Sequence, residues 1–180
     1  AAAGQAVEGD NGPVTVFNAG SIEATGPGGF GWGYGIRLFS GGFVSNAAGG
    51  VISGSDNAGI FVSGNAGTVI NAGSIMSSSG PSVFLTGRAG SVIDNTGRIG
   101  GSPTAGASSG GSSQSGGSAT NQAGGTISGY VGLLRNVAVA TVANGGVIAG
   151  NATQTYGAGI KFSSGGDVIN QSGATVTGYN

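Results

Sequence analysis

The sequence contains no cysteine, no histidine and very little charge, and each absence excludes a class of protein. Without cysteine the chain forms no disulfide bonds, and without both residue types it cannot ligate zinc, haem or an iron–sulfur cluster through them. No apolar run approaches the roughly eighteen residues of a membrane-spanning helix, so we expect no transmembrane segment. The few basic residues are scattered, so we expect no phosphate-binding patch and no nucleic-acid partner: Arg37, Arg88, Arg98, Arg135 and Lys161.

Glycine, by contrast, is abundant, at 43 of 180 residues, and hydrophobic residues make up 38% of the chain. Disordered chains are poor in hydrophobic residues and rich in charge, whereas only 6% of these residues are charged. We therefore expect a single ordered domain over residues 1–180. The net charge of −1 is smaller than the magnitude that usually keeps a small domain dispersed, which indicates self-association.

An internal repeat explains this composition. An apolar residue, any residue, an asparagine, a short glycine-containing bend and then Ile or Val recur at intervals of 23 to 28 residues. The bend has a short form, as in VFNAGSI, and a form two residues longer, as in VSNAAGGVI. Seven copies fill the chain, and their asparagines are Asn18, Asn46, Asn71, Asn95, Asn121, Asn144 and Asn170.

A second element follows in most units. Short segments with alternating apolar residues occupy 35–38, 59–62, 82–85 and 159–162, a pattern typical of half-buried strands. A unit of this size cannot bury its apolar side chains alone, so it stacks on its neighbours. The sequence thus predicts an all-β fold, a right-handed parallel β-helix (β-solenoid) of about seven coils with about 25 residues per coil.

Two inward ladders follow from this stacking. One is predicted to contain Val16, Val44, Val69, Ile93, Ala119, Val142 and Val168. The other is predicted to contain Ile22, Ile52, Ile75, Ile99, Ile127, Ile148 and Val176. We expect the seven asparagines to form a third, structural ladder, because stacked amides hydrogen-bond along the axis of a β-stack. A ligand-binding role would require outward exposure instead.

The Gly/Ser-rich segment 100–118 departs from the repeat. It reads GGSPTAGASSGGSSQSGGS between Ile99 and Ala119 and contains no apolar strand. Two interpretations are open, a flexible excursion loop or a degenerate side of the coil.

Three aromatic residues alternate in a glycine-rich stretch: Phe30, Trp32 and Tyr34. An extended backbone would place all three rings on one face. They form either a local cluster that covers the solenoid or a contact patch for carbohydrate or another subunit, since aromatic residues anchor interfaces. No helix follows, so the glycines do not form a phosphate loop.

The acidic residues are dispersed over different units: Glu8, Asp10, Glu23, Asp56, Asp94 and Asp167. Enzymes that cleave polysaccharides on a β-helix need clustered carboxylates. We therefore predict a protein that is not an enzyme, with no catalytic residues, no metal and no cofactor. A polysaccharide-active enzyme is the remote alternative.

The V-x-N-x-G-x-I motif, the following Gly-Ile and the GG turn together resemble the passenger repeats of bacterial autotransporter adhesins. The resemblance covers nearly the whole chain and implies a right-handed parallel β-helix displayed outside the cell, on the bacterial surface. Two features depart from that family. These 180 residues contain no segment that we expect to form a C-terminal membrane barrel, and passengers are usually much longer.

No charged or helical cap is visible at either end of the repeat, where a solenoid usually has one. The chain is then either a slice of a longer passenger or a subunit whose ends mate with other copies. The sequence favours an extracellular structural or adhesive solenoid that self-associates end to end into a fibre of identical chains. The alternative is an autotransporter passenger fragment that binds glycans of the host or of neighbouring cells.

Overall fold

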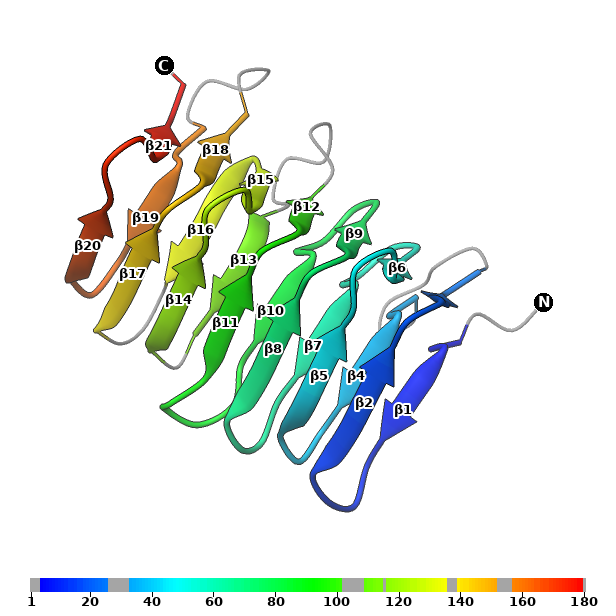
Figure 1. Cartoon of the computed structure of the whole chain (residues 1–180). Helices are drawn as coiled ribbons and strands as arrows, with labels where there is room; N and C mark the ends of the chain where they lie inside the picture. Colours follow the sequence, from blue (N-terminus) through cyan, green and yellow to red (C-terminus); the bar gives the residue numbers. More distant parts are fainter. Residues whose placement is uncertain are drawn as a thin grey trace.

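The computed structural model describes residues 4–25, 33–101, 109–114, 116–135, 139–151 and 157–179, and these residues form strands and turns without a helix. Accordingly, no helix in these ranges is long and apolar enough to cross a membrane. The strands form three parallel sheets of seven strands each. Consecutive strands of the chain enter different sheets, so three strands complete one coil (Figure 1).

The strands of each sheet follow one another along the axis of the molecule. The first sheet contains β1 (Val7–Gly9), β4 (Ile36–Leu38), β7 (Ile60–Val62), β10 (Val83–Leu85), β13 (Ser109–Ser113), β16 (Val131–Arg135) and β19 (Ile160–Phe162). The second contains β2 (Val14–Asn18), β5 (Gly42–Asn46), β8 (Gly67–Asn71), β11 (Val92–Asn95), β14 (Gly117–Asn121), β17 (Ala140–Asn144) and β20 (Gly166–Asn170). The third contains β3 (Ser21–Glu23), β6 (Val51–Gly54), β9 (Ser74–Ser77), β12 (Arg98–Gly101), β15 (Thr126–Gly129), β18 (Val147–Gly150) and β21 (Thr175–Thr177).

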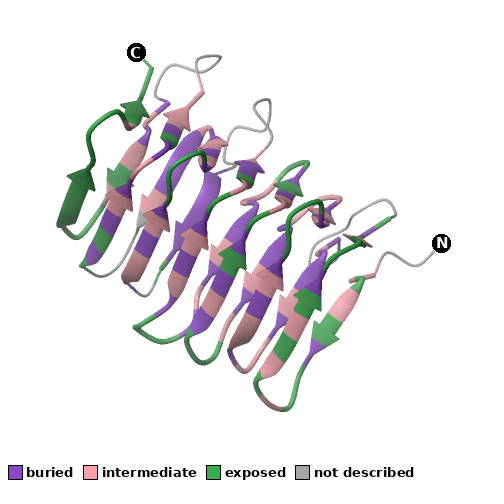
Figure 2. Ribbon diagram, viewed as in Figure 1, coloured by how far each residue is buried: buried purple, intermediate pink, exposed green. Residues whose placement is uncertain are grey.

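The predicted parallel β-solenoid of seven coils is confirmed. The register places all seven members of each predicted apolar ladder side by side, from Val16 to Val168 in the second sheet and from Ile22 to Val176 in the third. Their side chains fill the interior, and those of the middle coils are fully buried (Figure 2). Parallel pairing satisfies the backbone amides while the ladders exclude water from the core.

Part of the irregular segment is a side of the coil. Residues Ser109–Ser113 form strand β13, which pairs with β10 and β16 and is buried throughout. Gly111 stands at the inward position that Val83 and Leu133 occupy in the adjacent coils. A Cβ at Gly111 would lie 2.8 Å from Leu133 and 3.2 Å from Ile93, so these larger side chains fill the space that the glycine leaves. Residues 102–108 and 115 lie outside the described part of the chain.

The two forms of the bend use glycine for different reasons. In the long form, Gly49, Gly124 and Gly173 adopt left-handed backbone with φ of 82°, 83° and 80°, which L side chains rarely adopt. In the short form, a Cβ at Gly97 would lie within 3 Å of backbone atoms of the preceding coil. The short corner therefore needs glycine because adjacent coils approach closely there.

Candidate functional site

The seven asparagines form a continuous hydrogen-bonded ladder at the corner between the second and third sheets. The Nδ2 of each of the first six asparagines donates to the Oδ1 of the asparagine in the next coil, over distances of 2.8 to 2.9 Å. The same Nδ2 atoms also donate to corner carbonyls, as Asn95 does to Gly97 and Thr126. The first six asparagines are buried, at 0 to 7% exposure, so they face the interior and not a ligand in solvent.

The ladder has a direction, and its two ends differ. At the last coil, the exposed Asn170 donates through Nδ2 to the carbonyl of Ala174, at 3.0 Å, and to no other described residue. At the first coil, Asn18 Oδ1 accepts from the amide of Gly20, at 3.2 Å, and from no other residue that the structure describes. Within the ladder, Asn144 Oδ1 accepts both the equivalent amide and the preceding asparagine. One end therefore presents a donor and the other an acceptor with room for one more hydrogen bond.

Both end faces also expose parts of the apolar ladders. In the described last coil, Val168 is 47% and Val176 is 37% exposed, whereas their counterparts in the middle coils are fully buried. In the first coil, Val16 and Ile22 are only partly buried. Such faces combine unpaired strand edges with exposed apolar side chains, a combination that favours association with another strand layer.

The outer row of the second sheet is apolar at its two ends. Phe17 is 77% exposed in the first coil, and Ile169 is 57% exposed in the last. Successive pairings place both residues in one row, so each would neighbour the other if a second copy continued the coil. Cross-strand pairs of an aromatic and a β-branched residue stabilise adjacent strands.

Of the predicted aromatic patch, Tyr34 is described, whereas Phe30 and Trp32 lie outside the described residues. Tyr34 packs against Phe61, with ring centroids 5.3 Å apart. Phe61 also contacts Phe39 at 6.3 Å and Phe84 at 5.6 Å. Tyr34 thus belongs to an aromatic cluster on the outer face of the first sheet, comprising Tyr34, Phe39, Phe61 and Phe84.

The aromatic cluster also holds an arginine. The Arg37 guanidinium carbon lies 4.3 Å from the ring centroid of Phe39 and 5.2 Å from that of Tyr34, and Nη1 lies 3.8 Å from Glu8 Oε1. The rings are partly covered by one another, so the cluster fastens successive coils together on this face. This cluster was not predicted from the sequence, although Arg37, Phe61 and Phe84 each stand at the outward middle position of an alternating strand.

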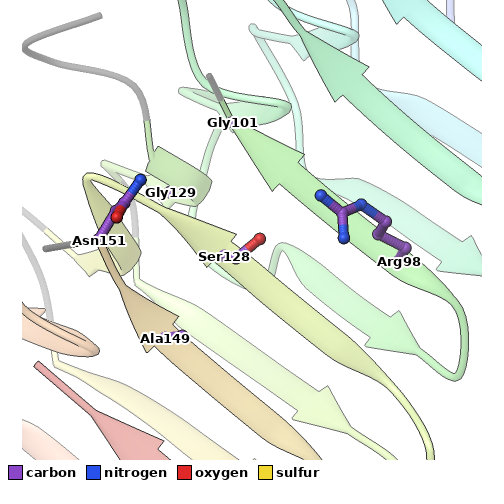
Figure 3. A pocket seen from close by; sticks show the side chains of 6 residues that line it. All are labelled: Arg98, Gly101, Ser128, Gly129, Ala149 and Asn151. Carbon is purple, nitrogen blue, oxygen red and sulfur yellow. The ribbon is translucent and has the colours of Figure 1, made fainter. Parts of the chain in front are cut away.

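Two hollows lie on the outer face of the third sheet and meet at Arg98. One, of about 310 Å³, is lined by Arg98, Gly101, Ser128, Gly129, Ala149 and Asn151 (Figure 3). The other, of about 520 Å³, extends from Arg98 in the opposite direction past Met76 to Ser53 and Ala24. The two hollows share Arg98 and Gly101, and their lining residues come from six successive coils, so the hollows are parts of one shallow groove along the solenoid axis.

The acidic residues do not converge in the described part of the chain. Glu8 pairs with Arg37, and Asp94 accepts a hydrogen bond from Gln122 at 3.1 Å. None of the described carboxylates lines the groove of the third sheet. Among the described residues, no group of three or more His, Cys, Asp or Glu residues stands close enough to hold a metal ion.

The fold and these surfaces define a three-sheet parallel β-solenoid with an internal asparagine ladder. Comparison with protein-family models, with curated proteins and with solved structures finds no match for this chain.

Proposed function

We propose that the chain is a non-catalytic structural and adhesive β-solenoid of the bacterial cell surface, whose copies stack end to end into a fibre. The observation that carries the proposal is the complementarity of the two end faces. Asn170 offers a donor where Asn18 offers an acceptor, and the same apolar ladders emerge at both ends. The resemblance to autotransporter adhesin repeats supports display outside the cell.

A junction between copies would repeat a contact that already exists inside the molecule. The last corner has the long form and the first corner has the short form. Inside the molecule, the long corner after Asn46 is likewise followed by the short corner after Asn71. The hydrogen bond between these two asparagines is 2.9 Å long. Strands β1, β2 and β3 of one copy would therefore continue the three sheets of another beyond β19, β20 and β21, with the same spacing of about 4.8 Å between strands.

The energetics favour this stacking. Burying a fully exposed branched side chain contributes about 1.5–3 kcal/mol. Several such side chains on each end face are only partly buried, so completing their burial would contribute a fraction of this value for each. The head-to-tail contact joins two different surfaces and repeats by translation along the axis, so it generates an open filament and not a closed ring. The small net charge of −1 adds little repulsion between copies.

Negative-stain electron microscopy across a dilution series tests the proposal. We expect fibres of uniform width for the native chain and dispersed short rods for Val168→Lys, which places a charge on the last apolar ladder position. Val147→Lys is the matched control, because Val147 is 41% exposed on the outer face of an inner coil, away from both end faces. Short rods of the native chain at every concentration would overturn the proposal and would favour a segment whose ends are covered by further coils of a longer passenger.

Gly20→Ala provides a second blocking variant. Gly20 occupies the short corner of the first coil, and a Cβ there meets nothing within 4 Å in the single copy. In a stacked pair the same Cβ would meet the preceding copy's corner, as it would at Gly73 inside the molecule. We therefore expect a folded protein that forms no fibres.

A further inference from the structure

We infer that the groove on the outer face of the third sheet binds an acidic oligosaccharide, with Arg98 as the residue that holds a sugar carboxylate. This site lies on the side of the solenoid. It is independent of the end faces that carry the proposed stacking.

Three groups converge at the centre of the groove: the Arg98 guanidinium, the Gly100 backbone and the Ser128 hydroxyl. A Cβ at Gly100 would lie 3.3 Å from both Nε and Nη2 of Arg98 and 3.5 Å from Ser128 Oγ. The guanidinium thus lies across the backbone of a residue that has no side chain, beside a hydroxyl from the next coil. Figure 3 shows the Arg98 and Ser128 side chains on the same face of neighbouring strands β12 and β15.

The groove selects an anion. Arg98 is exposed, and within the described residues its guanidinium forms no hydrogen bond and no ion pair. Its neighbours in the outer row of the sheet are Ser74 and Thr126, which are uncharged. A planar guanidinium with free donors matches the two oxygens of a carboxylate, and no described acid lines the groove to compete for it.

The lining favours a sugar chain over an acidic peptide. Strands β9, β12 and β15 are paired on both sides, so the groove offers no free strand edge to which a peptide could add. Met76, at 38% exposure, is the single large apolar side chain among the described lining residues, which therefore form no deep pocket for a peptide anchor. Serine hydroxyls and glycine backbone suit the many hydroxyl groups of a sugar, and the groove runs across successive coils as a linear oligomer requires.

Titration with an oligomer of galacturonic acid, followed by isothermal calorimetry, tests the inference. We expect the native chain to bind the oligomer, with an affinity that falls as salt is raised. Arg98→Gln should weaken binding about tenfold or more, since it removes charge-assisted hydrogen bonds to the carboxylate. Arg88→Gln is the matched control, because Arg88 is also exposed but lies outside the groove. The fully methyl-esterified oligomer lacks the negative charge. The native chain should bind it as weakly as Arg98→Gln binds the acidic oligomer.

The same titration with Val168→Lys separates this inference from the stacking proposal. The variant should bind the acidic oligomer like the native chain, whether or not fibres form. Equal binding by native chain, Arg98→Gln and Arg88→Gln would overturn the inference, as would equal affinity for the acidic and the esterified oligomer. Binding of a glutamate-rich peptide in place of the sugar would also overturn it and would reassign the groove to an acidic protein segment.

Discussion

At the scale of single residues, the asparagine ladder links buried amides in series. The contribution of each asparagine to the free energy of unfolding therefore depends on its position in the ladder. Asn95 is fully buried, accepts a hydrogen bond from Asn71 and donates one to Asn121, each at 2.8 Å. Asn170 has a ladder partner on one side only and is exposed. An unsatisfied buried polar group costs about 1–3 kcal/mol, whereas water replaces a lost partner at the surface.

We therefore predict that Asn95→Ala lowers the free energy of unfolding by about 2–4 kcal/mol, because two buried amides each lose a partner. Asn170→Ala should cost about 1 kcal/mol or less, since solvent reaches the end of the ladder. Urea unfolding followed by circular dichroism measures both values on dilute samples. Equal losses for the two variants would contradict the predicted difference between buried and terminal positions of the ladder.

At the scale of the elements, the repeating corner explains why strands stack at one spacing. A Cβ at Gly97 would lie too close to backbone atoms of Ala72 and Gly73, which cannot swing aside as a side chain can. We predict that Gly97→Ala lowers the free energy of unfolding by about 2 kcal/mol or more, as overpacked sites do. Gly20→Ala, at the same corner of the first coil, should be neutral or stabilising by about 0.4–1 kcal/mol, because it has open space and restricts the unfolded chain. Thermal unfolding under dilute conditions measures the stability of both variants. An equal loss of stability would contradict the explanation that the close approach of the preceding coil requires glycine at this corner.

The elements also show how far the sequence alone predicts this structure. The ladders, the seven coils and the corners were predictable because each unit repeats the same inward residues. Strand β13 was not, because Ser109–Ser113 contains no apolar side chain and is held by pairing with β10 and β16. The convergence of Arg98 and Ser128 over Gly100 was also hidden, since it depends on residues about one coil apart coming into register.

At the scale of the whole molecule, stability passes from coil to coil, because each coil contacts mainly its immediate neighbours. The middle coils are covered on both sides, whereas the described last coil is exposed along most of β20 and β21. A terminal coil in such an array opens more readily than an inner one. Stacking of copies would convert two terminal coils into inner coils, and this change is measurable along the chain.

Hydrogen exchange with mass spectrometry, compared between dilute and assembled samples, follows that change. We predict that peptides covering 157–179 and 4–25 exchange quickly in the dilute chain and slow by at least tenfold on assembly, which corresponds to about 1.4 kcal/mol of added local stability. Peptides covering 60–77 should exchange equally slowly in both samples, because that coil is already covered on both sides. Val168→Lys should keep the fast exchange at both ends at every concentration. Fibres in which 157–179 and 4–25 still exchange quickly would show that the copies associate through their sides, and the complementary end faces would then need another occupant.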